Sequence, residues 1–179
     1  IKKIFYLNSK LIPAVSVIIP TFNRAKLVSK ALKSIIDQTY ANWEVIVVDN
    51  HSTDNTDQIF KNFTDPRISY FKIHNRGVIA KSRNLGIRMA KGEWIAFLDS
   101  DDWWTKDKLE VCFNNIDDNV DFIYHELEII DDKSKFLKRK KFSGRELKKP
   151  ILNNLLQGLI KNGNAIGQSS VVVRKNLLL

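Results

Sequence analysis

The stretch Gly92-Glu93-Trp94-Ile95-Ala96-Phe97-Leu98-Asp99-Ser100-Asp101-Asp102-Trp103-Trp104 decides the fold, because an apolar run ends abruptly in three carboxylates. Residues 94–98 suit a strand buried on both faces, and in open α/β sheets ligands bind beyond the carboxyl ends of such strands. Three neighbouring anions repel one another unless a cation offsets them, and carboxylate oxygens suit Mg²⁺ or Mn²⁺. The pattern favours a ligand and metal site. The alternative is a polar turn in which Asp102 or Thr105 caps the next helix.

The rest of the chain alternates between strand and helix patterns. Strands are predicted at 15–20, closed by Pro20, and at 43–49, 68–73, 94–98, 120–130 and 168–174. Helices are predicted at 25–38, around 59–63 with Ser52, Thr53 and Asp54 as caps, at 80–90, at 106–116 and at 147–160. This alternation predicts an α/β domain with a mostly parallel sheet. Loops 21–24, 49–52 and 99–102 then meet at one edge of it.

Length and composition indicate one soluble globular domain. The chain has 179 residues, of which 44% are hydrophobic and 27% charged, which suits a single domain over 1–179 with a short leader at 1–13. No apolar run approaches the roughly 20 residues of a membrane-spanning helix, so we expect a cytoplasmic protein. The single cysteine, Cys112, cannot form an internal disulfide and is interpreted as a core residue.

The formal net charge of +9 comes mainly from a basic segment, Lys133–Lys149. Such a run is either a solvated loop or a surface that is attracted to an anionic membrane or to a phosphate-bearing acceptor. Aromatic residues do not interleave with it, which argues against a nucleic-acid partner.

Several candidate residues follow from position alone. Neither a phosphate-binding G-x-x-x-x-G-K-[ST] loop nor a G-x-G-x-x-G turn is present, which argues against kinase-like and dehydrogenase functions. Asp49 and Asn50 follow a strand and either bind a ribose or base or cap a helix. Lys81 and Arg83 oppose a helix dipole, so they either contact a diphosphate or lie in solvent.

Four ordered motifs, at 15–24, 47–54, 82–86 and 97–102, resemble those of family 2 glycosyltransferases. The match extends from about residue 14 to 130. It implies the GT-A fold, a Rossmann-like α/β/α arrangement, and inverting transfer from a nucleoside diphosphate sugar with a divalent metal, Mn²⁺ or Mg²⁺. A UDP-sugar is the favoured donor, and a polysaccharide or lipid-linked acceptor is expected, which would place the enzyme at the inner face of the membrane.

The resemblance also implies roles for single residues. Thr21 and Asn50 match positions near the nucleobase, Asp49 the adjacent acid, Asp99 a donor and metal contact, and Asp101 the metal ligand. The expected donor-binding set is Pro20, Thr21, Asn23, Asp49, Asn50, Lys81, Arg83, Asp99 and Ser100. The pair Asn50-His51 departs from the commoner family pattern.

A second departure concerns the general base. In the family a carboxylate beyond a strand like 169–174 takes the acceptor's proton, whereas no acid follows Glu146 in this sequence. We therefore expect a fragment whose base lies beyond Leu179. The alternative function is a nucleotide-binding module without catalytic activity. A phosphatase of the haloacid dehalogenase type is disfavoured because its acids follow the first strand.

Overall fold

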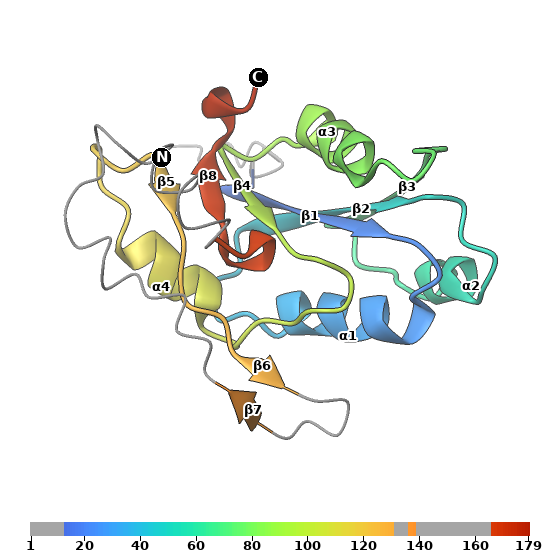
Figure 1. The fold of residues 1–179 in the computed structure, drawn as a ribbon. Coiled ribbons are helices and arrows are strands. Elements are labelled where there is room, and N and C mark those ends of the chain that lie inside the picture. The colour runs from blue at the N-terminus through green and yellow to red at the C-terminus, as the bar shows by residue number, and fades with distance from the viewer. Residues whose placement is uncertain (1–12, 131–135, 139–165) are drawn as a thin grey trace, which may run out of the picture.

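The computed structural model describes residues 13–130, 136–138 and 166–179. Its centre is a six-stranded sheet in the order β3-β2-β1-β4-β8-β5 (Figure 1). The strands are β1 Val15–Thr21, β2 Trp43–Asp49, β3 Ile68–Lys72, β4 Trp94–Phe97, β5 Phe122–Ile123 and β8 Val172–Arg174. A separate two-stranded sheet pairs β6 Ile129–Ile130 with β7 Phe136–Lys138.

The sheet is mostly parallel. β1 pairs in parallel with β2 and with β4, and β2 pairs in parallel with β3. β8 is antiparallel to both β4 and β5. The predicted α/β class with a largely parallel sheet is confirmed.

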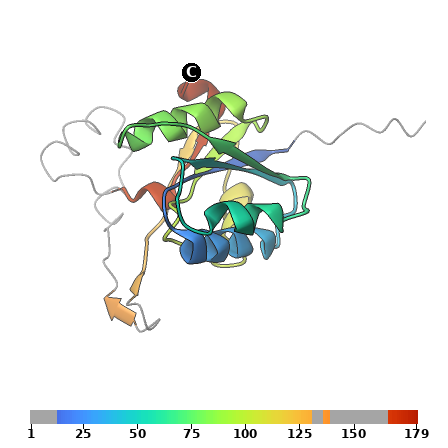
Figure 2. The ribbon, with the colours of Figure 1, turned by 90° about the vertical axis from the view of Figure 1, so that its right-hand side faces the viewer.

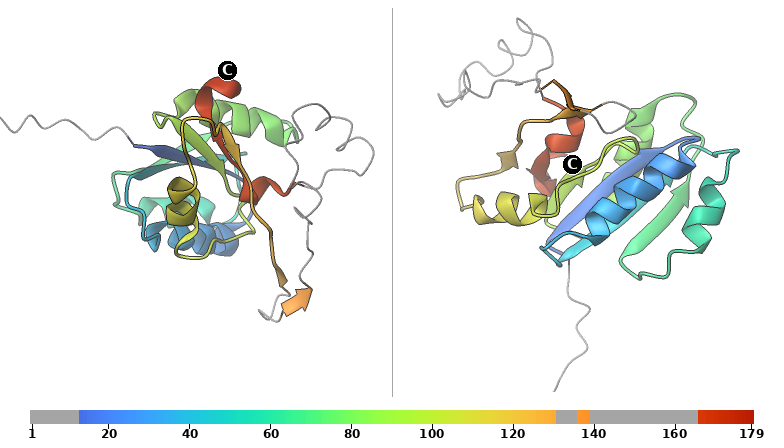
Figure 3. Two further views of the ribbon diagram at one scale, coloured as in Figure 1. Left: turned by 90° about the vertical axis from the view of Figure 1, so that its left-hand side faces the viewer. Right: turned by 90° about the horizontal axis from the view of Figure 1, so that it is seen from below.

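Helices cover both faces of the sheet and make three layers. α1 Ala25–Ile36, α2 Thr56–Lys61 and α4 Lys108–Asn114 lie on one face, and α3 Ile79–Met89 lies on the other (Figures 1 and 2). Seen from below, α1 runs along the middle of its face, with α2 and α4 to either side (Figure 3). In the part of the chain that the structure describes, no helix is long and apolar enough to cross a bilayer.

The alternation of side chains along β1 builds two cores. Val15, Val17 and Ile19 pack on the α1 side, whereas Ile18 packs on the α3 side with Ile87. The α1 helix contributes Val28, Ala31, Leu32 and Ile35, spaced along one stripe. Burial of each aliphatic side chain of this size contributes about 1.5–3 kcal/mol to stability, so this packing holds α1 firmly against β1.

A buried polar contact fixes the entry to β4. Glu44, 8% exposed, accepts hydrogen bonds from the Ser16 hydroxyl and the Lys91 N–H, both at 2.6 Å. The Gly92 N–H donates to Ser16 Oγ at 2.8 Å. This network aligns the start of β4 beside β1.

Four predicted boundaries, in β1, α1 and α4, were wrong by one or two residues. β1 continues through Pro20 to Thr21. Val48 of β2 lies beside Pro20 on one side. On the other side, the carbonyl of Ile18 accepts the Leu98 N–H and β4 ends opposite Ile18, so no β4 residue there needs the N–H that Pro20 lacks. α1 ends at Ile36, and α4 spans only Lys108–Asn114. Between the two helices, the Gln38 side chain donates to the Thr105 carbonyl at 2.7 Å and accepts the Leu109 N–H at 2.9 Å.

The predicted strand at 120–130 was wrong as a single element. Only Phe122–Ile123 joins the main sheet, and Ile129–Ile130 pairs in the small one. Residues 168–170 form a 3₁₀ turn, η2, before β8 begins. The predicted helix at 147–160, the leader through residue 12 and nearly all of the basic segment lie outside the described residues.

Candidate functional site

The carboxyl ends of β1 and β2 form the first part of the candidate site. Thr21 lies opposite Asp49, and the Asn50 N–H donates to the Thr21 carbonyl at 3.0 Å. Thr21 is 5% exposed, and its Oγ1 is buried without a hydrogen-bond partner among the described residues. Leaving such a hydroxyl unsatisfied costs about 1–3 kcal/mol. Thr21 is therefore suited to bond a ligand at this edge.

Asp49 is fully buried and holds the loop that follows β2. One carboxylate oxygen accepts from the Ser52 hydroxyl, and the other lies 3.0 Å from the Ser52 nitrogen and 2.8 Å from the Tyr70 hydroxyl. The sequence pointed to Ser52, Thr53 and Asp54 as caps of the next helix, but Ser52 instead bonds Asp49. Asp54 performs that task by accepting the Thr56 N–H at 3.1 Å.

Tyr70 connects two carboxylates beneath this loop. Its hydroxyl lies 2.8 Å from Asp49 and 2.5 Å from Asp57 and can donate to one of them at a time. Loss of hydration, reinforced by these hydrogen bonds, raises the pKa of Tyr70. The hydroxyl therefore stays protonated and orients Asp49 at neutral pH.

The loops after β1 and β2 are tied together by Asn23. This residue adopts φ +50°, its N–H donates to Ser52 Oγ at 2.8 Å, and its Oδ1 accepts the Thr53 N–H at 2.8 Å. Asp54 also accepts the N–H of Ala25, the first residue of α1, at 3.0 Å. The hydroxyl of Thr56 and this backbone bond lower the pKa of Asp54. Asn23 thus serves the geometry of the loop.

Asn50 joins the β2 end to the β3 end. Its Oδ1 accepts the Asn75 N–H at 2.8 Å, and Asn75 in turn donates to Ser82 Oγ in α3 at 3.0 Å. Beside it, the rings of His51 and His74 stack with centroids 3.6 Å apart. His51 has φ +54°, a left-handed conformation that glycine adopts at lower cost.

Asp99 meets Arg83 just beyond β4. Arg83 Nη2 lies 2.6 Å from Asp99 Oδ1, with side chains 19% and 31% exposed. Arg83 Nε is buried and has no hydrogen-bond partner among the described residues. Lys81, two residues earlier in the first turn of α3, is exposed. Of the two predicted cations, the structure brings Arg83 to the loop at residues 99–102, which we call the acidic loop.

Asp101 meets a cation from the other side. Arg24 Nη1 lies 3.0 Å from Asp101 Oδ2, and both side chains are about half exposed. Between the two acids, Ser100 is buried, at 8% exposure. An exposed ion pair of this kind contributes about 0–1 kcal/mol, so a bound metal or phosphate can displace it at small cost. The predicted convergence of loops 21–24, 49–52 and 99–102 is confirmed.

Ser169 of η2 forms hydrogen bonds with two residues of the acidic loop. Its Oγ accepts the Asp99 N–H at 2.9 Å and donates to Asp102 Oδ2 at 2.5 Å. Loss of hydration raises the pKa of Asp102, the negative charges of Asp101 and Asp99 add to this, and the Ser169 bond opposes it. Asp102 is therefore held in the loop, and in the first turn of α4 the Leu109 N–H donates to Gln38 Oε1 at 2.9 Å.

Asp99 and Asp101 fit a metal that is completed by its substrate. Among the residues that the structure describes, no three His, Cys, Asp or Glu side chains gather to hold an ion alone. Mg²⁺ and Mn²⁺ sites in nucleotide enzymes commonly use one or two carboxylates plus substrate phosphate oxygens. Two carboxylates from one short loop, each facing an arginine, match that donor set.

Sequence reasoning missed Ser169, Arg24 and Tyr70 as parts of this site. Ser169 lies 70 residues from Asp99, and its position in an apolar stretch indicates only a strand. Arg24 and Tyr70 belong to segments predicted for other reasons, and only the three-dimensional contacts assign them to the carboxylates.

The comparisons agree with this geometry. The sequence profile described as "Glycosyl transferase family 2" matches residues 16–177, so the chain belongs to that family. The chain is 27% identical to Staphylococcus aureus TarS 1–349 in complex with UDP-GlcNAc, with a TM-score of 0.72 over 92% of this chain and 46% of that one. It is 30% identical to a mannosyltransferase from Pyrobaculum calidifontis in complex with GDP-Man and Mn²⁺, with a TM-score of 0.57 over 68% and 36%. These likenesses confirm the GT-A fold.

Two curated bacterial relatives show how much of such proteins the chain covers. It is 38% identical to an Escherichia coli protein, UDP-Glc:alpha-D-GlcNAc-diphosphoundecaprenol beta-1,3-glucosyltransferase WfgD, over 75% of this chain and 55% of that protein. It is 41% identical to the Bacillus subtilis putative teichuronic acid biosynthesis glycosyltransferase TuaG over 55% and 40%. The chain thus spans about half the length of these relatives.

Proposed function

We propose that the protein is a metal-dependent, inverting glycosyltransferase that takes a sugar from a nucleoside diphosphate sugar, with a UDP-sugar as donor. The proposed acceptor is a growing polysaccharide or a lipid-linked glycan, and the proposed place of reaction is the cytoplasm at the inner face of the membrane. The name of the Escherichia coli relative supports a UDP-sugar donor and a lipid-linked acceptor, and the UDP-GlcNAc and GDP-Man complexes of the structural neighbours support a nucleotide-sugar donor.

The observation that carries the proposal is the meeting of Thr21, Asn50, Asp99 and Asp101 at one sheet edge. The first two adjoin the ends of β1 and β2, where we place the nucleobase with Pro20, Asn23 and Asp49 around it. The two acids lie in the acidic loop after β4, where Asp99 pairs with Arg83 and Asp101 pairs with Arg24. A nucleoside diphosphate has a base at one end and negative charge at the other, and this edge offers matching groups in that order.

The chain's own residues perform distinct tasks in this proposal. Thr21 and Asn50 orient the base, and Ser100 and Asp99 hold the donor. Arg83, with Lys81 beside it, neutralises the diphosphate that leaves. A divalent metal held by Asp101 and Asp99 would supply further charge neutralisation. Inversion by direct displacement requires a general base for the acceptor hydroxyl.

Calorimetric titration with UDP, with and without MnCl₂, tests the donor site. We expect binding that strengthens with Mn²⁺ and loses that dependence in Asp101→Asn. The matched control is Asp118→Asn, an exposed acid in the loop after α4. Unchanged Mn²⁺ dependence in Asp101→Asn would refute the metal assignment, and absence of UDP and GDP binding would refute the donor site.

Transfer is tested separately with a panel of nucleotide sugars and the longest native form of the protein. Release of nucleoside diphosphate that depends on an added glycan acceptor supports the enzyme. Metal-dependent UDP binding without transfer from any donor would favour the nucleotide-binding module instead.

A further inference from the structure

The outward side of α1 carries a basic and partly apolar surface. Its buried stripe faces the sheet, so the intervening residues point away from it. We call this surface the α1 face and define it as Lys26, Leu27, Lys30, Lys33, Trp103 and Lys106. Leu27 is 37% exposed and Trp103 38% exposed. The α1 face thus combines four lysines with two exposed apolar side chains.

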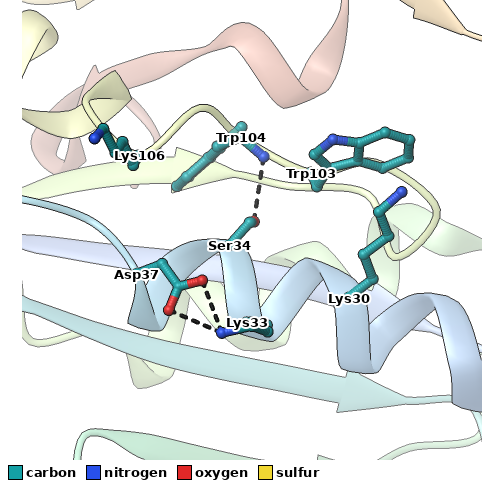
Figure 4. Close-up of a pocket in the computed structure, with 7 residues that line it drawn as sticks. All are labelled: Lys30, Lys33, Ser34, Asp37, Trp103, Trp104 and Lys106. Atoms are coloured by element: carbon teal, nitrogen blue, oxygen red, sulfur yellow. Dashed lines mark hydrogen bonds and ion pairs between the residues drawn. The ribbon is translucent and has the colours of Figure 1, made fainter. Parts of the chain in front are cut away.

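A shallow hollow of about 250 Å³ lies within the α1 face (Figure 4). Lys30 Nζ lies 3.0 Å from the centroid of the Trp103 ring. Lys106 lies at the other end of the hollow, in the same loop as Trp103. Asp37 is the acid that lines it, and Lys33 is its partner at 2.9 Å. The hollow therefore keeps a positive charge, with an indole at its rim.

Trp103 and Trp104 have contrasting environments. Trp104 is 6% exposed, and its indole N–H donates to the Ser169 carbonyl at 2.8 Å, so its place in the core is accounted for. Trp103 instead lies on the surface under a lysine. An indole that is half wet and flanked by lysines is typical of side chains placed at the headgroup level of a bilayer.

We propose that the α1 face docks on the surface of an anionic lipid bilayer. Lysine ammonium groups near such a surface each contribute about 1 kcal/mol, and Trp103 and Leu27 supply the apolar contact that a purely electrostatic surface lacks. A soluble polyanion would use the lysines alone. This surface differs from the basic segment Lys133–Lys149, which the sequence indicated and which lies mostly outside the described residues.

Docking through the α1 face fixes the distance between the proposed donor site and the surface of the bilayer. Arg24, paired with Asp101, immediately precedes α1, so the acidic loop lies at one end of this face. A protein seated on α1 holds that loop beside the lipid headgroups. The functional value of this orientation rests on the lipid-linked acceptor proposed above, whereas the docking itself does not.

Co-sedimentation with vesicles tests the proposal in the absence of donor and metal. We expect the protein to bind phosphatidylcholine vesicles that contain phosphatidylglycerol and not those of phosphatidylcholine alone, with binding that weakens as salt rises. Lys30→Gln with Lys106→Gln should lower the partition coefficient about 30-fold, which is about 2 kcal/mol at about 1.4 kcal/mol per factor of ten. The matched control is Arg88→Gln in the last turn of α3 with Lys91→Gln just after that helix, which removes the same charge at the end of the helix that covers the opposite face.

Tryptophan emission provides an independent measurement. Binding to anionic vesicles should shift the emission to the blue in the native protein and not in Trp103→Phe, because only Trp103 of this loop enters the interface. Unchanged thermal denaturation in the lysine variants shows that they fold. Any one of four outcomes would overturn the proposal. Two are equal losses of vesicle binding in the α1 and α3 variants, and equal affinity of the protein for soluble polyphosphate. The others are an unchanged emission shift in Trp103→Phe, and loss of vesicle binding only when Lys138, Lys140 and Lys141 are neutralised. None of these outcomes depends on the donor site.

Discussion

Ser169 Oγ accepts the Asp99 backbone N–H at 2.9 Å, across 70 residues of sequence, and it donates to Asp102 from the same atom. Ser169→Ala removes both bonds from a buried position and leaves the Asp99 N–H unsatisfied. We expect a loss of about 1–3 kcal/mol in the free energy of unfolding, measured by urea denaturation. We also expect weaker Mn²⁺-dependent UDP binding. Ser170→Ala is the control, since its hydroxyl donates to the Gly167 carbonyl at 2.7 Å and not, among the described residues, to the acidic loop. If both variants weaken UDP binding equally, Ser169 has no special place in the loop.

Thr21→Val should separate stability from binding. The substitution keeps the shape of the side chain and removes a buried hydroxyl that has no partner among the described residues. We expect unfolding free energy to stay equal or to rise by up to about 1 kcal/mol, while UDP affinity falls about 5- to 10-fold. Thr56→Val is the opposite case, because the Thr56 hydroxyl donates to Asp54 at 2.5 Å. It should lower stability and spare UDP binding. Unchanged UDP affinity in Thr21→Val would exclude Thr21 from the donor site.

Lys108→Met should stabilise the protein near neutral pH. Lys108 is 5% exposed, its Nζ has no hydrogen-bond partner among the described residues, and burial lowers its pKa from 10.5 to about 8. Because the pKa is lower in the folded state, folding disfavours the charged amine below about pH 8, and this cost disappears as pH rises to about 10.5. A shift of this size corresponds to about 3 kcal/mol, and lost contact with the Trp104 ring offsets part of it.

Urea unfolding of wild type and Lys108→Met at several pH values measures this effect. The variant should be more stable by about 1–3 kcal/mol at pH 7, and the difference should shrink between pH 8 and 10.5. Lys106→Met, which alters an exposed lysine, should change stability by less than about 0.5 kcal/mol. A difference that does not vary with pH would mean that Lys108 is not charged and desolvated in the native state.

Gly92→Ala and Gly77→Ala should differ in cost for different reasons. A Cβ at Gly92 would lie 2.7 Å from the Ser16 nitrogen and 2.8 Å from the Val15 carbonyl carbon, so the backbone of β1 must move. We expect a loss of about 3 kcal/mol. At Gly77 nothing lies within 4 Å, and the cost of about 1 kcal/mol comes from φ +77° alone. Thermal denaturation compares the two variants. Equal losses would show that the β4 entry can relax.

The sequence was sufficient to predict the parallel half of the fold. Apolar runs that end in Thr21, Asp49 and Asp99 are separated by helical patterns, and parallel strands joined by helices bring their carboxyl ends together. The candidate site could be located for that reason. What could not be predicted is how its side chains pair. Whether Asp49 is open to a ligand or bonded to Ser52 depends on a local turn whose alternatives differ by a single hydrogen bond.

The antiparallel half was harder to predict because its strands are short and distant in sequence. β5 has two residues, and β8 has three, so neither shows a long alternating pattern. Their pairing is set by Arg174, which contacts Asp121, Glu93 and the Trp94 ring. Contacts made by one partly buried arginine leave no periodic signal in the sequence.

The position of β8 between β4 and β5 also sets an order of events during synthesis. β1, β2, β3 and β4, with α1 and α3, are complete once residue 97 has left the ribosome, and their contacts are comparatively local. The last support of the acidic loop arrives about 70 residues later, with Ser169 and β8. Because pairing across such a separation is slow to form, the nascent chain exposes the β4 edge and an unsupported Asp99 for that interval, and the acidic loop is among the last parts of the domain to become ordered.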